Sequence, residues 1–114
     1  MKVKVNEKLV QAERKRLLNL YKEIPEDKLK VVDGLITQAA RLRIMLNYMW
    51  EDIKENGDYE MFSQSEKAEP YERERPVAKL FNTRDGAYQK IIKQLSDLLP
   101  EVKEDTDTPS DDYV

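Results

Sequence analysis

The chain has 114 residues, of which 38% are charged and 39% hydrophobic, and its formal net charge at pH 7 is −3. This length suits one small domain with a modest core. The absence of Cys excludes a disulfide framework and thiolate chemistry, and the absence of His removes the commonest general base and metal ligand at neutral pH.

No apolar run approaches the roughly 18 residues of a membrane span, and the basic residues 1–5 lead into no hydrophobic signal-peptide segment. We therefore expect a soluble, intracellular protein that makes no membrane contact. Charge is unevenly distributed, because residues 1–30 hold nine Lys or Arg against five acids, whereas residues 101–114 hold one against six. Such a layout is compatible with a polyanion at one end and a basic protein surface at the other.

The first predicted element is a helix over residues 6–23, with Asn6 as its N-cap. Pro25 fits the first position of a second, unusually long helix over residues 25–56, and Gly57 supplies the left-handed residue after its end. Apolar residues recur along this second helix at alternating steps of three and four, which places them on one stripe.

In the second half of the long helix the apolar stripe is wider than the roughly 100° that one partner covers. The helix therefore needs neighbours on more than one side, and copies of the same chain are the natural cover for the surplus. The sequence leaves open which apolar residues face a second copy and which face the chain's own helices. The predicted self-interface draws on Leu35, Ala39, Leu42, Ile44, Leu46, Tyr48, Met49 and Trp50.

Residues 58–75 show neither a helical nor a strand period and carry six acids, so they predict an exposed acidic loop. A third helix is expected over residues 76–99, stopped by Pro100. The predicted fold is thus all-α, a three-helix bundle with a long central helix that assembles into a homo-oligomer.

Residues 101–114 are acidic and offer almost nothing to bury, so they predict a disordered tail outside the helical domain of residues 1–100. Such a tail can fold onto a basic partner protein. The residues expected to make that contact are Glu104, Asp105, Asp107, Asp111, Asp112 and Tyr113.

Catalysis has little support in this sequence, and we expect no enzyme, no catalytic residue, no metal and no cofactor. Glu51 and Glu55 share a helix face with Asp52 nearby, as carboxylate metal ligands sometimes do, but no matched pair exists on another helix. A solvated face is the simpler interpretation. The three glycines stand far apart at 34, 57 and 86, so no phosphate-binding loop is present.

Nucleic-acid binding is better supported. Arg14, Lys15 and Arg16 are consecutive on the first helix, and Lys2, Lys4 and Lys8 precede them. Such clusters neutralise phosphates without reading base sequence, and an oligomer would multiply the avidity of each weak patch. An ordinary solvated surface is the simpler alternative. If these six residues are not the site, the third helix offers Lys79, Arg84, Lys90 and Lys93 instead.

Several segments of this chain resemble the small-terminase-like proteins of tailed phages and prophages of low-GC Gram-positive bacteria. The likeness covers roughly residues 17–100. It rests on Leu35, Ile36, Ala39, Ala40 and Leu42, on IKENG at 53–57, on RP at 75–76, on KLFNT at 79–83, on Tyr88, and on IKQLSDLLP at 92–100. The chain departs from the family in residues 58–75, where the family is richer in Gly and Asn.

The resemblance implies a non-enzymatic DNA-packaging protein, the small terminase subunit, in the cytoplasm of the host bacterium. Such a protein binds viral double-stranded DNA, assembles with copies of itself as a ring, and hands DNA to the large ATPase-nuclease subunit of the terminase. The competing class is a helical adaptor or scaffold protein without nucleic-acid binding, which the negative net charge favours slightly.

Overall fold

The computed structural model describes residues 4–100 of the chain. It contains the helices α1 (Glu7–Leu20), α2 (Glu26–Asn56) and α3 (Pro76–Asp97), with the strands β1 (Tyr59–Phe62) and β2 (Tyr71–Glu74) between α2 and α3. The described chain is therefore mostly helical, as the sequence predicts, with a small two-stranded sheet that the sequence did not predict.

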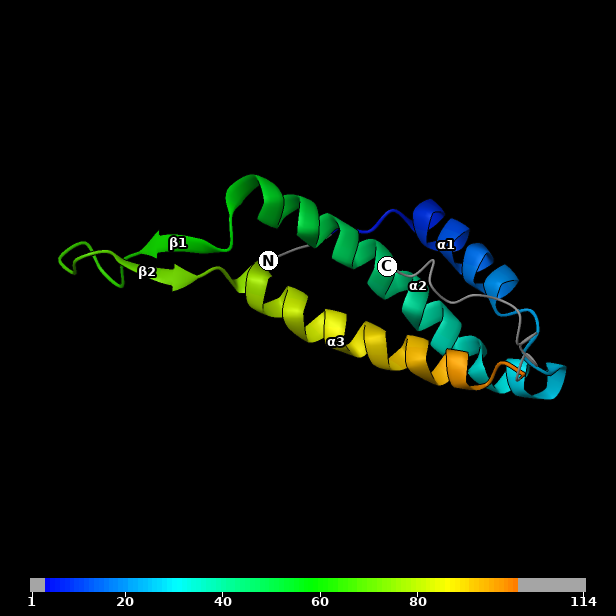
Figure 1. The fold of residues 1–114 in the computed structure, drawn as a ribbon. Coiled ribbons are helices and arrows are strands. Elements are labelled where there is room, and N and C mark those ends of the chain that lie inside the picture. The colour runs from blue at the N-terminus through cyan, green and yellow to red at the C-terminus, as the bar shows by residue number, and fades with distance from the viewer. Residues whose placement is uncertain (1–3, 101–114) are drawn as a thin grey trace, which may run out of the picture.

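The helices form a bundle, and the molecule with its strands is elongated, with principal extents of 66 × 35 × 19 Å. Helix α3 returns antiparallel along α2, while α1 lies along the N-terminal half of α2 on another side (Figure 1). The strands project beyond the opposite end of the bundle from the turn between α1 and α2 (Figure 1). The strand end and α1 therefore lie far apart within one chain.

The helix ends follow the local signals in the sequence. The Asn6 side chain accepts a hydrogen bond from the backbone N–H of Lys8 at 2.9 Å, which confirms the predicted N-cap. Gly57 ends α2 with a φ of 84°, a backbone conformation that favours glycine. Pro25 is the N-cap of α2 rather than its first helical residue, so the helix begins one residue later than predicted.

The core lies between the three helices and is wholly apolar among the described residues. Helix α2 contributes six buried side chains, and α1 and α3 pack against it from different sides. The hydroxyl groups of Tyr21 and Ser96 lie 3.0 Å apart and join the end of α1 to the end of α3. The buried residues are Val10, Leu17, Tyr21, Ile24, Val32, Ile36, Ala39, Ala40, Leu46, Met49, Val77, Ala78, Tyr88, Ile91 and Leu95.

The prediction of an irregular loop over residues 58–75 is wrong in its central feature. Strands β1 and β2 pair antiparallel, with Glu60 opposite Arg73 and Phe62 opposite Tyr71. One face of this hairpin is closed by an ion pair of 2.8 Å between Glu60 and Arg73, whose guanidinium lies 3.5 Å from the centre of the Phe62 ring. Tyr71 packs edge-on against Phe62. Apolar residues occur on both faces of the hairpin, and a charged pair lies on the sheltered face. The strands therefore lack the alternation of apolar and polar residues by which a strand is predicted from sequence.

Candidate nucleic-acid interface

The predicted basic cluster on α1 is divided by ion pairs within the chain. Arg14 donates through Nη2 to Asp33 at 2.5 Å and through Nε to the hydroxyl of Thr37 at 3.1 Å, so it joins α1 to α2. Arg16 binds Glu13 through two hydrogen bonds of 2.7 and 2.8 Å, and this carboxylate raises the pKa of Arg16 above its ordinary value. Two of the three positive charges are therefore balanced locally.

The lysines of α1 remain exposed. Lys8 and Lys15 are seven residues apart, about two helical turns, and both point to the outer side of α1. Neither forms an ion pair with another described residue, and Lys4 is likewise exposed, whereas Lys2 lies outside the described residues. Leu9 and Leu20 flank this outer side with 45% and 55% of their surface exposed. The outer side of α1 is therefore both basic and apolar.

The outer side of α3 has a different character. Lys79 and Lys90 are eleven residues apart, about three turns, so their side chains project in nearly the same direction. Both are exposed and without an ion pair in the described part of the chain. Lys93 lies beside Lys90 and binds Asp97 at 2.8 Å, which raises the pKa of Lys93.

The neighbours of these lysines are polar. Asn82, Thr83 and Gln94 are exposed near them on the outer side of α3, and no large exposed apolar residue of the described chain belongs to this helix. Arg84 does not join Lys79, Lys90 and Lys93 on the outer side of α3. Its guanidinium turns inward against the sulfurs of Met45 and Met49 on α2. Backbone phosphates are bound by lysines and by polar donors of this kind.

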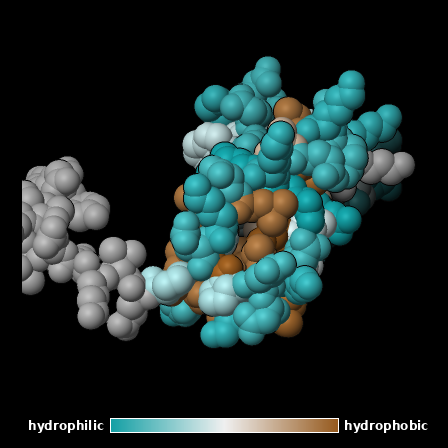
Figure 2. All heavy atoms as spheres, turned by 90° about the vertical axis from the view of Figure 1, so that its right-hand side faces the viewer, coloured by the Kyte–Doolittle hydropathy of each residue, from teal (hydrophilic) through white to brown (hydrophobic). Residues whose placement is uncertain are grey.

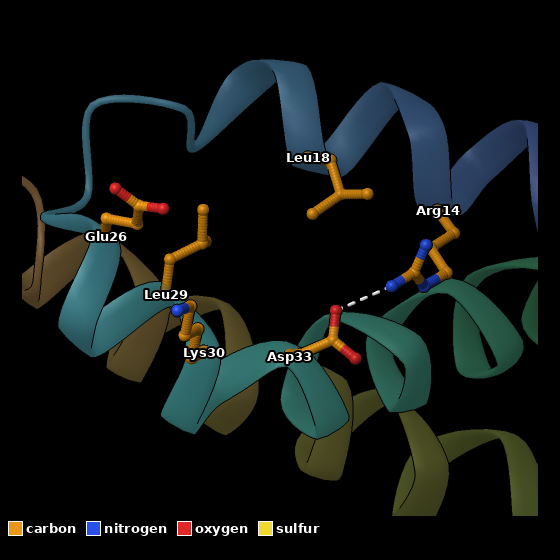
Figure 3. Close-up of a pocket in the computed structure, with 6 residues that line it drawn as sticks. All are labelled: Arg14, Leu18, Glu26, Leu29, Lys30 and Asp33. Atoms are coloured by element: carbon orange, nitrogen blue, oxygen red, sulfur yellow. Dashed lines mark hydrogen bonds and ion pairs between the residues drawn. The ribbon is translucent and has the colours of Figure 1, made fainter.

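A groove of about 440 Å³ separates α1 from the start of α2, with Leu18 and Leu29 facing each other across it and Lys30 at its edge (Figure 3). The Arg14–Asp33 pair lies at one end and Glu26 at the other. Its charges are therefore mixed. Figure 2 shows hydrophobic residues exposed among hydrophilic ones at the bundle end. A hollow of about 280 Å³ is lined by Asp27, Lys28, Val31, Val32 and Leu98.

The carboxylates at the end of α2 are engaged in structural contacts. Asp52 accepts hydrogen bonds from Asn56 at 2.7 Å and from Arg75 at 2.9 Å, and these two contacts lower its pKa. Arg75 also donates to the backbone carbonyl of Gly57 at 2.7 Å, so it holds the base of the hairpin against α2. Glu51 pairs with Lys54 at 3.0 Å. Within residues 4–100, no group of three or more potential ligands is arranged to hold a metal ion.

The structure divides the residues of the predicted self-interface by burial into three buried residues, four partly covered residues and the half-exposed Trp50. Ala39, Leu46 and Met49 have no exposed surface and pack inside the chain's own core. Trp50 is half-exposed and packs against Phe81, with ring centres 6.0 Å apart and ring planes tilted by 39°. The remaining four, which are only partly covered, are Leu35, Leu42, Ile44 and Tyr48. Within the predicted self-interface, only the partly covered residues and Trp50 therefore keep surface for a second copy.

Sequence reasoning missed the apolar residues of the hairpin as a surface. Tyr59 and Met61 are 51% and 68% exposed in the middle of an acidic segment. Two large apolar side chains between acids were the available signal, but without a strand period they did not indicate a surface. The predicted contacts of the tail, residues 104–113, lie outside the described residues.

Comparison of the chain with protein-family models, curated proteins and solved structures finds no match. In the part of the chain that the structure describes, no helix is long and apolar enough to cross a membrane.

Proposed function

We propose that this chain is a DNA-packaging protein of the small terminase subunit type. It binds viral double-stranded DNA without performing catalysis, associates with copies of itself, and passes DNA to the large ATPase-nuclease subunit in the cytoplasm of the host bacterium. The sequence resemblance suggests this role. The basic and polar outer side of α3 is the structural observation that best supports DNA contact, because Lys79, Lys90 and Lys93 share a surface there with hydrogen-bond donors.

The geometry favours α3 over α1 as the DNA-binding helix. On α1, Arg14 and Arg16 are held by Asp33 and Glu13, and the free lysines have exposed leucines beside them. On α3, the positive stripe is bordered by polar residues, which keep their hydration next to phosphate without burying apolar surface. We therefore place the main phosphate contacts on Lys79 and Lys90, with Lys93 assisting by exchanging Asp97 for a phosphate.

Binding to a duplex of arbitrary sequence at low salt tests this proposal, with the α1 lysines as the matched control. The double variant Lys79→Ala/Lys90→Ala should bind more weakly at all sequences. Its dependence of log K on log salt should flatten by up to about two units per bound copy, because each phosphate contact contributes about 0.9. Lys8→Ala/Lys15→Ala removes the same charge from α1. If only the α1 variant loses affinity while its oligomeric mass is unchanged, the site is the one that the sequence alone indicated.

A helical adaptor or scaffold protein without nucleic-acid affinity is the second candidate. Four large apolar side chains are exposed around the hairpin, namely Trp50, Tyr59, Met61 and Tyr71, and such surfaces are typical of protein contacts. Absence of any retention on duplex DNA at low salt would support this adaptor function over the terminase function.

A further inference from the structure

The open face of the hairpin combines apolar residues with uncompensated acids. In the antiparallel register Tyr59 lies opposite Glu74, and Met61 lies opposite Glu72. Paired residues project from the same side of a sheet, so these four side chains share the face that the Glu60–Arg73 pair does not occupy. All four are exposed, and neither glutamate forms an ion pair with a described residue.

This face continues onto the end of the helical bundle. Glu74 and Trp50 line one hollow of about 170 Å³, together with Phe81 of α3. Trp50 packs against Phe81 and still exposes half of its surface. We call Trp50, Tyr59, Met61, Glu72 and Glu74 the hairpin surface. A two-stranded hairpin is marginally stable in water when nothing packs on it, so this surface gains from being covered.

The outer side of α1 has the complementary properties. Lys8, Leu9, Lys15 and Leu20, which we call the α1 surface, combine two unpaired positive charges with two half-exposed leucines. Seven large hydrophobic residues are exposed among the described residues, and five of them belong to these two surfaces. One surface is acidic and the other basic, as complementary protein surfaces are.

The two surfaces of one chain cannot meet. Helix α1 is fastened to the N-terminal half of α2 by the Arg14–Asp33 pair, whereas the hairpin extends from the opposite end of the bundle (Figure 1). We propose that the hairpin surface of one copy docks on the α1 surface of a second copy. This inference specifies the contact behind the self-association in the proposed function.

Such a contact joins two different surfaces, so every copy in a row keeps one free surface for the next. A contact of this kind closes into a ring or continues as a helical filament. It also covers Lys8 and Lys15 while leaving the outer side of α3 available for DNA. On each copy, the neighbour's acidic hairpin then binds α1, and the phosphate backbone binds α3.

Charge reversal with measurement of mass in solution, without DNA, tests the proposal. Glu72→Lys/Glu74→Lys and Lys8→Glu/Lys15→Glu should each weaken self-association by about ten- to a hundredfold, because two attractive pairs become repulsive. All four changes together in one chain should restore the wild-type mass. Met61→Ser should weaken association without changing charge, and circular dichroism of each variant should match that of the wild type.

The control is Lys79→Glu/Lys90→Glu, which makes the same charge change on α3 and should leave the mass unaltered while weakening DNA binding. Wild-type mass in both single-surface variants, or failure of the fourfold variant to reassociate, would overturn the docking proposal. A wild-type chain that stays monomeric at high concentration would overturn it as well. None of these outcomes depends on DNA, whereas absence of DNA binding in an assembled wild-type protein would refute only the proposed function.

Discussion

Leu46 offers the clearest test of which apolar residues of α2 belong to the chain's own core. Its side chain has no exposed surface and lies in the buried cluster that also contains Leu17 and Leu95. Leu46→Ala removes three carbon groups, worth about 0.8 kcal/mol each, and leaves a cavity between packed helices. The expected loss in free energy of unfolding is about 2 to 5 kcal/mol.

Thermal unfolding gives the direct measurement. For a domain of this size, a loss of about 2.5 kcal/mol lowers Tm by about 10 to 20 °C. Leu20→Ala is the matched control, because 55% of the Leu20 surface is already exposed and the expected loss is below about 1 kcal/mol. The Tm difference between wild type and Leu46→Ala should be the same across protein concentrations. A difference that grows on dilution would place Leu46 at a contact between copies and refute the assignment.

Three further outcomes are expected. Gly57→Ala should lower the free energy of unfolding by about 1 to 3 kcal/mol in chemical denaturation, because φ is 84° at this residue. Gly34→Ala should raise it by about 0.5 to 1 kcal/mol, because the site is helical with no heavy atom within 4 Å of the added carbon. Equal effects of the two substitutions would contradict this reasoning. Asp52 has its pKa held below the ordinary 3.8 by Asn56 and Arg75, so its contribution is present above pH 3.8 and lost as pH falls toward the lower folded value. Stability measured from pH 6 downward should therefore decline less steeply in Asp52→Asn, and parallel curves would show that the carboxylate contributes nothing. Deletion of residues 103–114 should leave Tm and oligomeric mass nearly unchanged, because this acidic segment offers almost nothing to bury. A truncated chain that loses its fold would disprove the tail prediction.

The sequence alone determined the helices and most of their ends. Helical period in the apolar residues reports which side of a helix avoids water, and this property is local to each segment. Asn6 and Gly57 end their helices through contacts within a few residues, so they too can be found from sequence. The main core of α1, α2 and α3 was predictable for the same reason.

The tertiary structure alone decided what covers each apolar face and which charges are available. Arg14 pairs with Asp33 from another helix, so the run of basic residues at 14–16 overstated the charge open to DNA. Periodicity also cannot tell whether a second copy or α3 covers Leu46. The hairpin was not predicted because its sheltered face carries the Glu60–Arg73 ion pair, whereas the apolar Met61 is exposed on the other face. This is the reverse of the pattern by which a strand is recognised in a sequence.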